Sequence, residues 1–205
     1  MISLKLCNIG KEYGQRKVFS EINAEAPLGS SLAITGRNGS GKSTLLRIIA
    51  GLIRPTIGSA IIEIDGKEAS QAERRNLVGL VAPDLALYEE LTALENLQFF
   101  TKVRGMNRGV KDLRELIARV GLAGREDEPL SSYSSGMKQR VKYAFALLHN
   151  PPILLLDEPT ANLDAEGVKL VDEIITEHKK EGLLVLATND KKEEGYGDQV
   201  IELGV

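Results

Sequence analysis

A glycine-rich stretch at residues 36–44, GRNGSGKST, contains residue types that bind phosphate. It fits the pattern G-x-x-x-x-G-K-[ST] and stands between the apolar LAIT and the helix-like TLLRIIA, which is the context this motif requires. Its glycines allow the backbone to curl so that N–H groups point at phosphate oxygens, and Lys42 adds a compact cation for the β- and γ-phosphates. The Ser43 hydroxyl is a candidate Mg²⁺ ligand. The predicted nucleotide contacts are Gly36, Arg37, Asn38, Gly39, Ser40, Gly41, Lys42, Ser43 and Thr44.

Two carboxylates follow an unbroken apolar run in the stretch ILLLDEP. Such a run is typical of a parallel strand covered on both faces, and the carboxyl end of that strand lies at the ligand edge of an α/β sheet. We expect Asp157 to hold Mg²⁺, directly or through a water, and Glu158 to accept a proton from an attacking water. Alone, the pair would fit two solvated acids at a strand end; beside a phosphate loop, the catalytic interpretation is favoured.

A second helix start with the chemistry of an anion site occurs in SSYSSGMKQR, residues 131–140. Small hydroxyl residues and a glycine lead directly into a helix-forming run, which leaves free backbone N–H groups at the positive end of the helix dipole. The sequence thus predicts two separate helix N-termini in this chain, each suited to binding a phosphate group.

The elements that position these residues follow from hydrophobic periodicity. Strands are predicted at residues 2–9, 17–26, 30–35, 59–66, 76–82, 151–159, 183–190 and 199–203. The pattern is helical from Thr92 to about Leu122, beginning with the capping box formed by Thr92 and Glu95. The fold class is therefore α/β, with a parallel core sheet, an N-terminal β portion and an inserted helical block.

Composition excludes several classes of protein. The 205 residues contain 26 Lys and Arg against 29 Asp and Glu, so no basic excess indicates a nucleic-acid partner. No apolar run approaches the ~20 residues needed to cross a bilayer, so a membrane process would require another chain. Cys7 is the only cysteine, which precludes an internal disulfide, and we expect it to be buried in the first strand.

Taken together, GRNGSGKST, YSSGMKQR, LLLDEPTANLD and LATND resemble, in this order, the nucleotide-binding subunit of ABC transporters. The resemblance covers essentially the whole chain and implies one ATP-binding domain over 1–205. The implied domain consists of a P-loop NTPase core (1–84 and 151–205), which includes an antiparallel N-terminal β portion, and a helical subdomain (85–150). In that family the segment at Ser134, Ser135 and Gly136 is the signature loop, which contacts the γ-phosphate of ATP bound to the other subunit of a head-to-tail dimer.

The resemblance assigns further residues. Tyr13 matches the aromatic residue that stacks on adenine, and Asp164 matches a loop that communicates between the two ATP sites. Asp164 also fits a local role as helix N-cap, which is compatible with the first. The implied cofactors are ATP and Mg²⁺.

Two positions depart from the family pattern. Pro83 replaces a glutamine near Mg²⁺ and the attacking water, and proline offers no side-chain hydrogen bond. The adjacent Asp84 either takes over as a Mg²⁺ ligand or simply begins a turn, and the two interpretations are equally weighted. Asn189 replaces a histidine; its amide still donates a hydrogen bond to the γ-phosphate but cannot become cationic. We therefore expect ATP binding with slowed hydrolysis.

The implied function is to energise transport by a separate transmembrane subunit through ATP-driven dimerisation of this chain with itself or a paralogue. The implied location is the cytoplasmic face of the cell membrane, reached through that partner. The short chain, ending at Val205, resembles the haem-exporter ATPase of cytochrome c maturation. The alternatives are a soluble ABC-type ATPase of iron–sulfur assembly and an interaction protein that binds ATP but barely hydrolyses it.

Overall fold

Two sheets carry the nucleotide-site candidates in the computed structural model, which describes residues 1–204. They belong to one of two compact units, made of Met1–Leu80, Pro152–Pro159 and the chain from Ile175 on. The second unit consists of Val81–Pro151 and Thr160–Ile174. Both the α/β class and the antiparallel N-terminal sheet that the sequence predicts are confirmed.

The first sheet contains four strands in the order β2-β1-β4-β5. Its strands are β1 (Ile2–Tyr13), β2 (Arg16–Pro27), β4 (Ile57–Ile64) and β5 (Lys67–Glu68), and every pairing is antiparallel. The first strand is longer than predicted and ends at Tyr13, which pairs with Arg16 across a tight turn. Tyr13 therefore has a fixed position at a strand end.

The second sheet has the order β6-β7-β8-β3-β9. It comprises β3 (Ser31–Gly36), β6 (Val78–Val81), β7 (Ile153–Asp157), β8 (Leu183–Ala187) and β9 (Gln199–Leu203). The pairings of β7 with β8, β8 with β3 and β3 with β9 are parallel. All residues of β7 and β8 are buried, which explains their unbroken apolar sequences.

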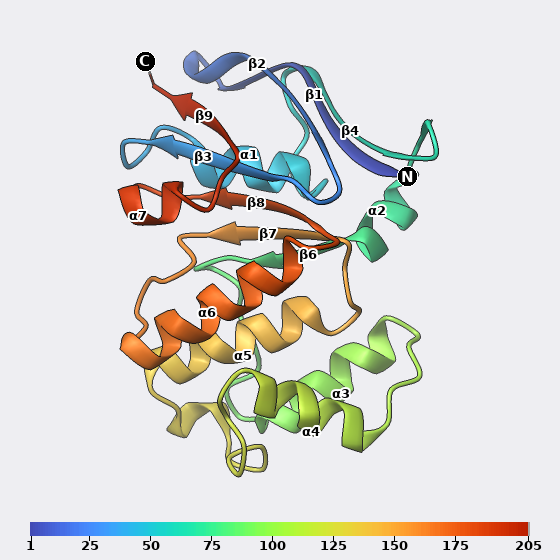
Figure 1. The fold of residues 1–205 in the computed structure, drawn as a ribbon, viewed down its shortest axis with the longest axis vertical. Helices are drawn as coiled ribbons and strands as arrows, with labels where there is room; N and C mark the ends of the chain where they lie inside the picture. Colours follow the sequence, from blue (N-terminus) through green and yellow to red (C-terminus); the bar gives the residue numbers. More distant parts are fainter. Residues whose placement is uncertain (205) are drawn as a thin grey trace. The chain divides into compact units, whose positions relative to one another are not determined.

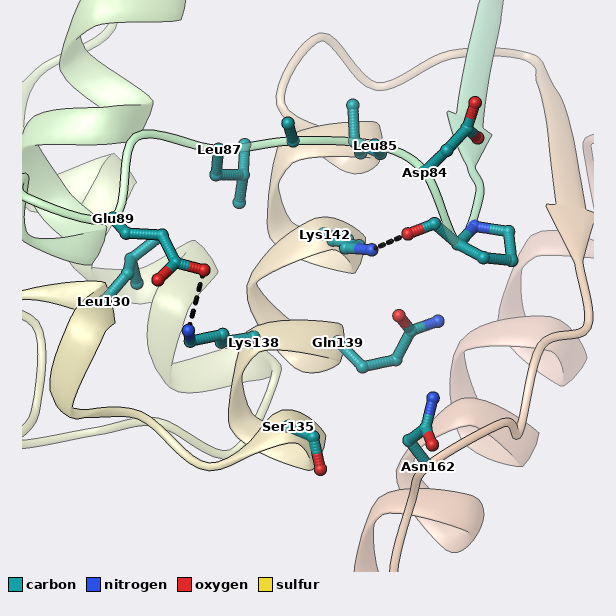
Figure 2. Close-up of a pocket in the computed structure, with 12 residues that line it drawn as sticks. Asp84, Leu85, Leu87, Glu89, Leu130, Ser135, Lys138, Gln139, Lys142 and Asn162 are labelled. Carbon is teal, nitrogen blue, oxygen red and sulfur yellow. Dashed lines mark hydrogen bonds and ion pairs between the residues drawn. The ribbon is translucent and has the colours of Figure 1, made fainter.

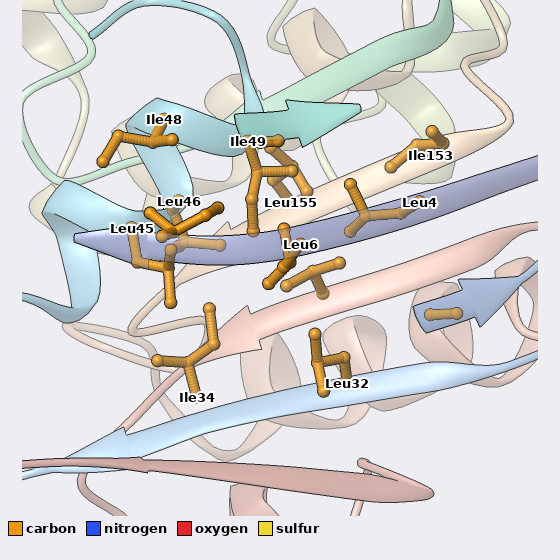
Figure 3. Packing of buried hydrophobic residues seen from close by; sticks show 14 of the residues in the cluster. Leu4, Leu6, Leu32, Ile34, Leu45, Leu46, Ile48, Ile49, Ile153 and Leu155 are labelled. Carbon is orange, nitrogen blue, oxygen red and sulfur yellow. The ribbon is translucent and has the colours of Figure 1, made fainter. Parts of the chain in front are cut away.

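Helix α1 (Lys42–Ile49) lies between these sheets (Figure 1). It packs on β3, β7 and β8 on one side and on β4 on the other. Its apolar side chains meet Leu4 and Leu6 of β1 and Leu32 and Ile34 of β3 (Figure 3). Because α1 begins at the phosphate loop, this core fixes the direction in which the loop leaves β3.

The second unit is helical. It contains α3 (Ala93–Val103), α4 (Val110–Arg119), a short 3-10 helix (Leu130–Ser132), α5 (Ser135–Leu147) and the first turns of α6 (Ala165–His178). The predicted capping box is confirmed, since Thr92 and Glu95 bond reciprocally at the start of α3. Within residues 1–204, no helix combines the length and the apolar character needed to cross a membrane.

Two expectations were wrong, and one helix was missed. Residues 71–77 form α2 (Gln71–Leu77), not the start of the predicted strand 76–82, because Ser70 and Glu73 make a second capping box. A further short helix, α7 (Lys191–Glu194), was not predicted. Cys7 is exposed, since it faces away from the core that its neighbours Leu4 and Leu6 enter.

The start of β3 is tied to the segment before β9 by one carboxylate. Asp198 accepts hydrogen bonds from the backbone N–H of Ser31 (2.9 Å) and from its hydroxyl (2.8 Å). The Ser31 hydroxyl and Lys179 hold the pKa of Asp198 below its usual value. A carboxylate with a depressed pKa stabilises the fold above the unfolded-state pKa, and this stabilisation is lost as pH falls through the folded-state value.

We predict that Asp198→Asn lowers the free energy of unfolding near pH 7 by roughly 0.2–1 kcal/mol, because the charge it removes is partly screened by solvent. The difference from the wild type should shrink as pH falls below about 4, where the Asp198 carboxyl group of the unfolded chain becomes protonated, and it should vanish below the depressed folded-state pKa. Urea unfolding between pH 7 and pH 3 measures it, with exposed Glu115→Gln as control. A difference that is constant with pH would contradict the role of the Asp198 charge.

Candidate functional site

The phosphate loop begins where β3 ends and closes at the first residue of α1. Gly36, Gly39 and Gly41 all have positive φ, at 142°, 82° and 103°. At Gly36 a Cβ atom would lie 2.4 Å from the carbonyl oxygen of Leu203, and at Gly41 it would lie 2.5 Å from Val18. Glycine is therefore required at both positions, for conformation and for space.

Lys42 is the buried cation of this loop, with 6% of its surface exposed. Its Nζ donates a hydrogen bond of 2.9 Å to the carbonyl of Gly36 and lies 3.8 Å from a carboxylate oxygen of Glu158. A buried ammonium needs such partners. Phosphate oxygens offer the same ammonium group stronger, charge-assisted hydrogen bonds.

The paired carboxylates lie where the apolar strand β7 ends. Asp157 is its last residue and is only 3% exposed. Glu158 follows with a φ of 50°, a left-handed conformation that is uncommon outside glycine. Its backbone N–H donates to the carbonyl of Ala187 at the end of β8, which fixes this conformation.

The Glu158 side chain is partly buried, and burial raises the pKa of its carboxyl group above the usual value. The nearby charges of Glu193 and Asp157 raise it further, whereas Lys42 and a backbone hydrogen bond from Asn189 oppose this effect. A raised pKa makes a carboxylate a stronger proton acceptor, as a general base requires.

Asn189 reaches the phosphate loop directly. Its side-chain Nδ2 donates a hydrogen bond of 3.0 Å to Oδ1 of Asn38. Two candidate residues that are 151 positions apart in sequence are thus in contact at the loop. Asn189 presents a neutral amide there.

A cavity of about 440 Å³ brings many of the candidates of this unit together, although Gly36, Arg37, Ser40, Asp157 and Asn189 are not among its lining residues. Its lining includes Tyr13, Asn38, Gly39, Gly41, Lys42, Ser43, Thr44 and Glu158. The Tyr13 ring is 52% exposed, and Nζ of Lys11 lies 4.8 Å from its centroid. Arg16 and Val18 also line the cavity and were missed by sequence reasoning. The tight turn after Tyr13 was the available signal for Arg16, since it places the two residues opposite each other.

The donor set of this cavity fits a nucleotide with magnesium. The Ser43 hydroxyl in its lining is an oxygen ligand of the type that Mg²⁺ prefers, and so is the carboxylate of Asp157, which is buried next to Glu158 but does not line the cavity. Among residues 1–204 there is no cluster of three or more His, Cys, Asp or Glu side chains suited to a metal.

The second helix N-terminus suited to an anion, that of α5, lies in the helical unit. Ser134 is the N-cap of α5, and its hydroxyl accepts a hydrogen bond from the N–H of Met137. Ser135 is exposed at the first helical position. At Gly136 a Cβ atom would lie 3.1 Å from the carbonyl of Asn162, so a larger residue would press on that loop.

Asp84 and Asp164 also belong to the helical unit. Asp84 follows Pro83 and lines a second cavity of about 460 Å³ with Ser135, Gln139 and Asn162 (Figure 2). Asp164 accepts a hydrogen bond from the N–H of Gly167, as its predicted local role at the start of α6 requires.

The segment at Pro83 is held by a lysine that sequence reasoning did not single out. Lys142 of α5 donates hydrogen bonds to the carbonyls of Ala82 (3.2 Å) and Pro83 (2.7 Å). Burial lowers the pKa of Lys142, and the charge of Asp84 opposes that effect. The backbone at Pro83 is thus tied to helix α5.

We predict that Gly41→Ala reduces affinity for a fluorescent ATP analogue at least tenfold, because its methyl group would collide with Val18 and Phe19. Gly39→Ala is the matched control: its φ is also positive, but nothing lies within 4 Å of the added methyl group. It should lose much less affinity. Equal losses for the two variants would refute the steric argument.

Comparisons with known proteins agree with this geometry. The family model described as ABC transporter matches residues 19–161. The lantibiotic transport ATP-binding protein SrtF of Streptococcus pyogenes is 36% identical over 91% of this chain and 79% of its own length. The cytochrome c biogenesis ATP-binding export protein CcmA of Haemophilus influenzae is 32% identical over 92% of this chain and 89% of its own.

Among solved structures, a dimeric post-hydrolysis state of the ATP-binding cassette MJ0796 bound to ADP and Pi has a TM-score of 0.82. It is 28% identical in sequence, and the match covers 99% of this chain and 94% of that one. The phosphate loop, the strand-end carboxylates and the fold thus point to one conclusion. The chain belongs to the ABC transporter family and is one of its ATP-binding proteins.

Proposed function

We propose that this protein binds and hydrolyses ATP with Mg²⁺ to energise transport by a separate transmembrane subunit. The observation that carries the proposal is the cavity that gathers the phosphate loop, Lys42 and Glu158 with an aromatic residue at its rim. Phosphoryl transfer depends mainly on positioning and charge neutralisation, which such a site provides.

Each side chain has a distinct proposed task. Lys42 neutralises charge on the β- and γ-phosphates, and Tyr13 stacks on the adenine. Glu158 takes the proton of the attacking water, a contribution of ~10²–10⁴ in rate. Asn189 donates a hydrogen bond to the γ-phosphate. Mg²⁺, held by Ser43 and Asp157, would supply positive charge at the phosphates; Asp84 stays a candidate further ligand.

We further propose that ATP binds between two copies of this chain, or between this chain and a paralogue. Ser134, Ser135 and Gly136 of one copy would contact the γ-phosphate held by the phosphate loop of the other. The free N–H groups at the start of α5 and the exposed Ser135 support this role. The dimeric MJ0796 structure supports two-fold assembly. Asp164 would then communicate between the two sites.

The transmembrane partner is proposed to dock on the helical unit and to hold this chain at the cytoplasmic face of the membrane. Tyr88 (49% exposed) and Phe99 (40% exposed) form an edge-to-face pair there, with ring centroids 5.1 Å apart. Exposed aromatic groups of this kind are enriched at protein interfaces. The names of SrtF and CcmA, a transport and an export protein, favour this assignment over iron–sulfur assembly.

A weakly hydrolysing, nucleotide-responsive interaction protein is the second candidate. The neutral amide of Asn189 on the phosphate loop and the absence of a polar side chain at Pro83 favour it. Steady-state ATP turnover with Mg²⁺ separates the two functions.

We predict that Glu158→Gln binds ATP with near wild-type affinity, lowers turnover at least 100-fold and accumulates as a closed dimer. The amide preserves the side-chain shape but cannot accept the proton of the water. Phosphate release and light scattering measure the two effects. Turnover at the wild-type rate would remove Glu158 from the role of general base.

For the signature loop, we predict that Ser135→Arg leaves ATP affinity of the monomer within twofold yet abolishes ATP-dependent dimerisation of the Glu158→Gln protein. The bulky side chain would occupy the space that the γ-phosphate needs. Gln71→Arg, which adds the same charge at an exposed site on α2, is the control and should still dimerise. Unchanged dimerisation of Ser135→Arg would contradict the contact in trans.

A further inference from the structure

A buried carboxylate lies beside the candidate site, and so far it has entered only as a charge that raises the pKa of Glu158. Glu193 belongs to the short helix α7 and is only 4% exposed. Glutamate is rarely buried so completely unless its charge is matched by hydrogen bonds or other partners. The surroundings of Glu193 therefore indicate what it holds in place.

One partner of Glu193 is Thr188, which is fully buried just after β8. The Thr188 hydroxyl donates to the Glu193 carboxylate and accepts a hydrogen bond of 2.9 Å from the N–H of Asp190. The backbone N–H of Thr188 donates to the carbonyl of Ile34 in β3. The Asp190 side chain, in turn, accepts from the N–H of Lys192 at the start of α7.

These bonds fix the residues on both sides of Asn189. The Asn189 amide then has a defined direction and reaches Asn38 of the phosphate loop. The backbone of the same residue contributes a hydrogen bond to the carboxylate of Glu158. A single turn, anchored through Thr188 to Glu193, thus contacts both the phosphate loop and the proposed base.

We propose that Glu193 is a positioning residue for ATP hydrolysis, which holds Thr188 so that the Asn189 amide stands at the γ-phosphate. This inference rests on the proposed role of Asn189 as a phosphate donor. Glu193 itself does not touch the substrate; it acts through the turn. The hydrogen bond between Thr188 and Glu193 matters at this site because Asn189 is neutral. A neutral amide must be well aligned to donate a hydrogen bond, whereas a charged group attracts phosphate from many directions.

The first test compares two substitutions of Glu193. Glu193→Ala should lower kcat for ATP roughly ten- to hundredfold, the cost of a displacement of about 1 Å in a catalytic group, with KM within twofold. Glu193→Gln should recover most of the activity, because its amide oxygen can still accept the Thr188 hydroxyl. Glu194→Ala, on the same helix, is the control and should match the wild type. A loss for Glu193→Ala seen only in KM would overturn the proposal.

The second test combines Glu193→Ala with Asn189→Ala. If Glu193 acts through Asn189, the double variant should be no slower than Asn189→Ala alone, whereas independent effects would multiply. Multiplying losses would overturn the proposal and leave the function of the site intact. An unchanged rate for Asn189→Ala alone would instead refute the proposed role of Asn189, and with it this inference.

Should Glu193→Ala fail to fold, the other end of the bond provides the same test. Thr188→Val removes the hydroxyl, and Thr188→Ser keeps it. We expect a loss in kcat for Thr188→Val that is absent in Thr188→Ser and in the Asn189→Ala background. Equal rates for the two Thr188 variants would contradict the proposal.

Discussion

The site depends on the contacts that hold the buried ammonium group of Lys42 in place. The ammonium group is held against carbonyl groups of its own loop and near Glu158, and this arrangement exists only because glycines allow the loop to curl where a side chain would strike Leu203 or Val18. The core between the two sheets fixes α1 and hence the loop. A triphosphate that enters the cavity meets a cation whose position is already set, which reduces the reorganisation needed during the reaction.

The chain carries a second helix start suited to an anion, on its other compact unit. Its N-cap is occupied by Ser134, while Ser135 stays exposed. In the proposed dimer, this surface completes the nucleotide site of another copy, so that ATP binding and dimer formation are coupled. The turn that carries Asn189, anchored by Glu193, lies at the phosphate loop and would add a neutral hydrogen-bond donor from the same copy that holds the phosphates.

Features governed by local rules could be predicted from the sequence. The phosphate loop, the buried strand before Asp157 and the capping box at Thr92 each depend on neighbouring residues. Helix α2 was missed because its short sequence lacks an amphipathic period, although the capping box of Ser70 and Glu73 at its start was a readable local signal. Glu193 could not be predicted, since its burial arises from the packing of α7. The contact of the signature loop in trans came only from the resemblance to a family.

The most direct test of ATP binding between two copies mixes two defective proteins in the Glu158→Gln background, one with Lys42→Ala and one with Ser135→Arg. In a dimer of either protein alone, both ATP sites are defective: the phosphate loop is impaired by Lys42→Ala, and the signature loop by Ser135→Arg. A mixed dimer has one intact site, made of the phosphate loop of the Ser135→Arg chain and the signature loop of the Lys42→Ala chain. The account predicts that neither protein occludes labelled ATP alone and that the mixture occludes one ATP per dimer. A mixture that occludes none would contradict it.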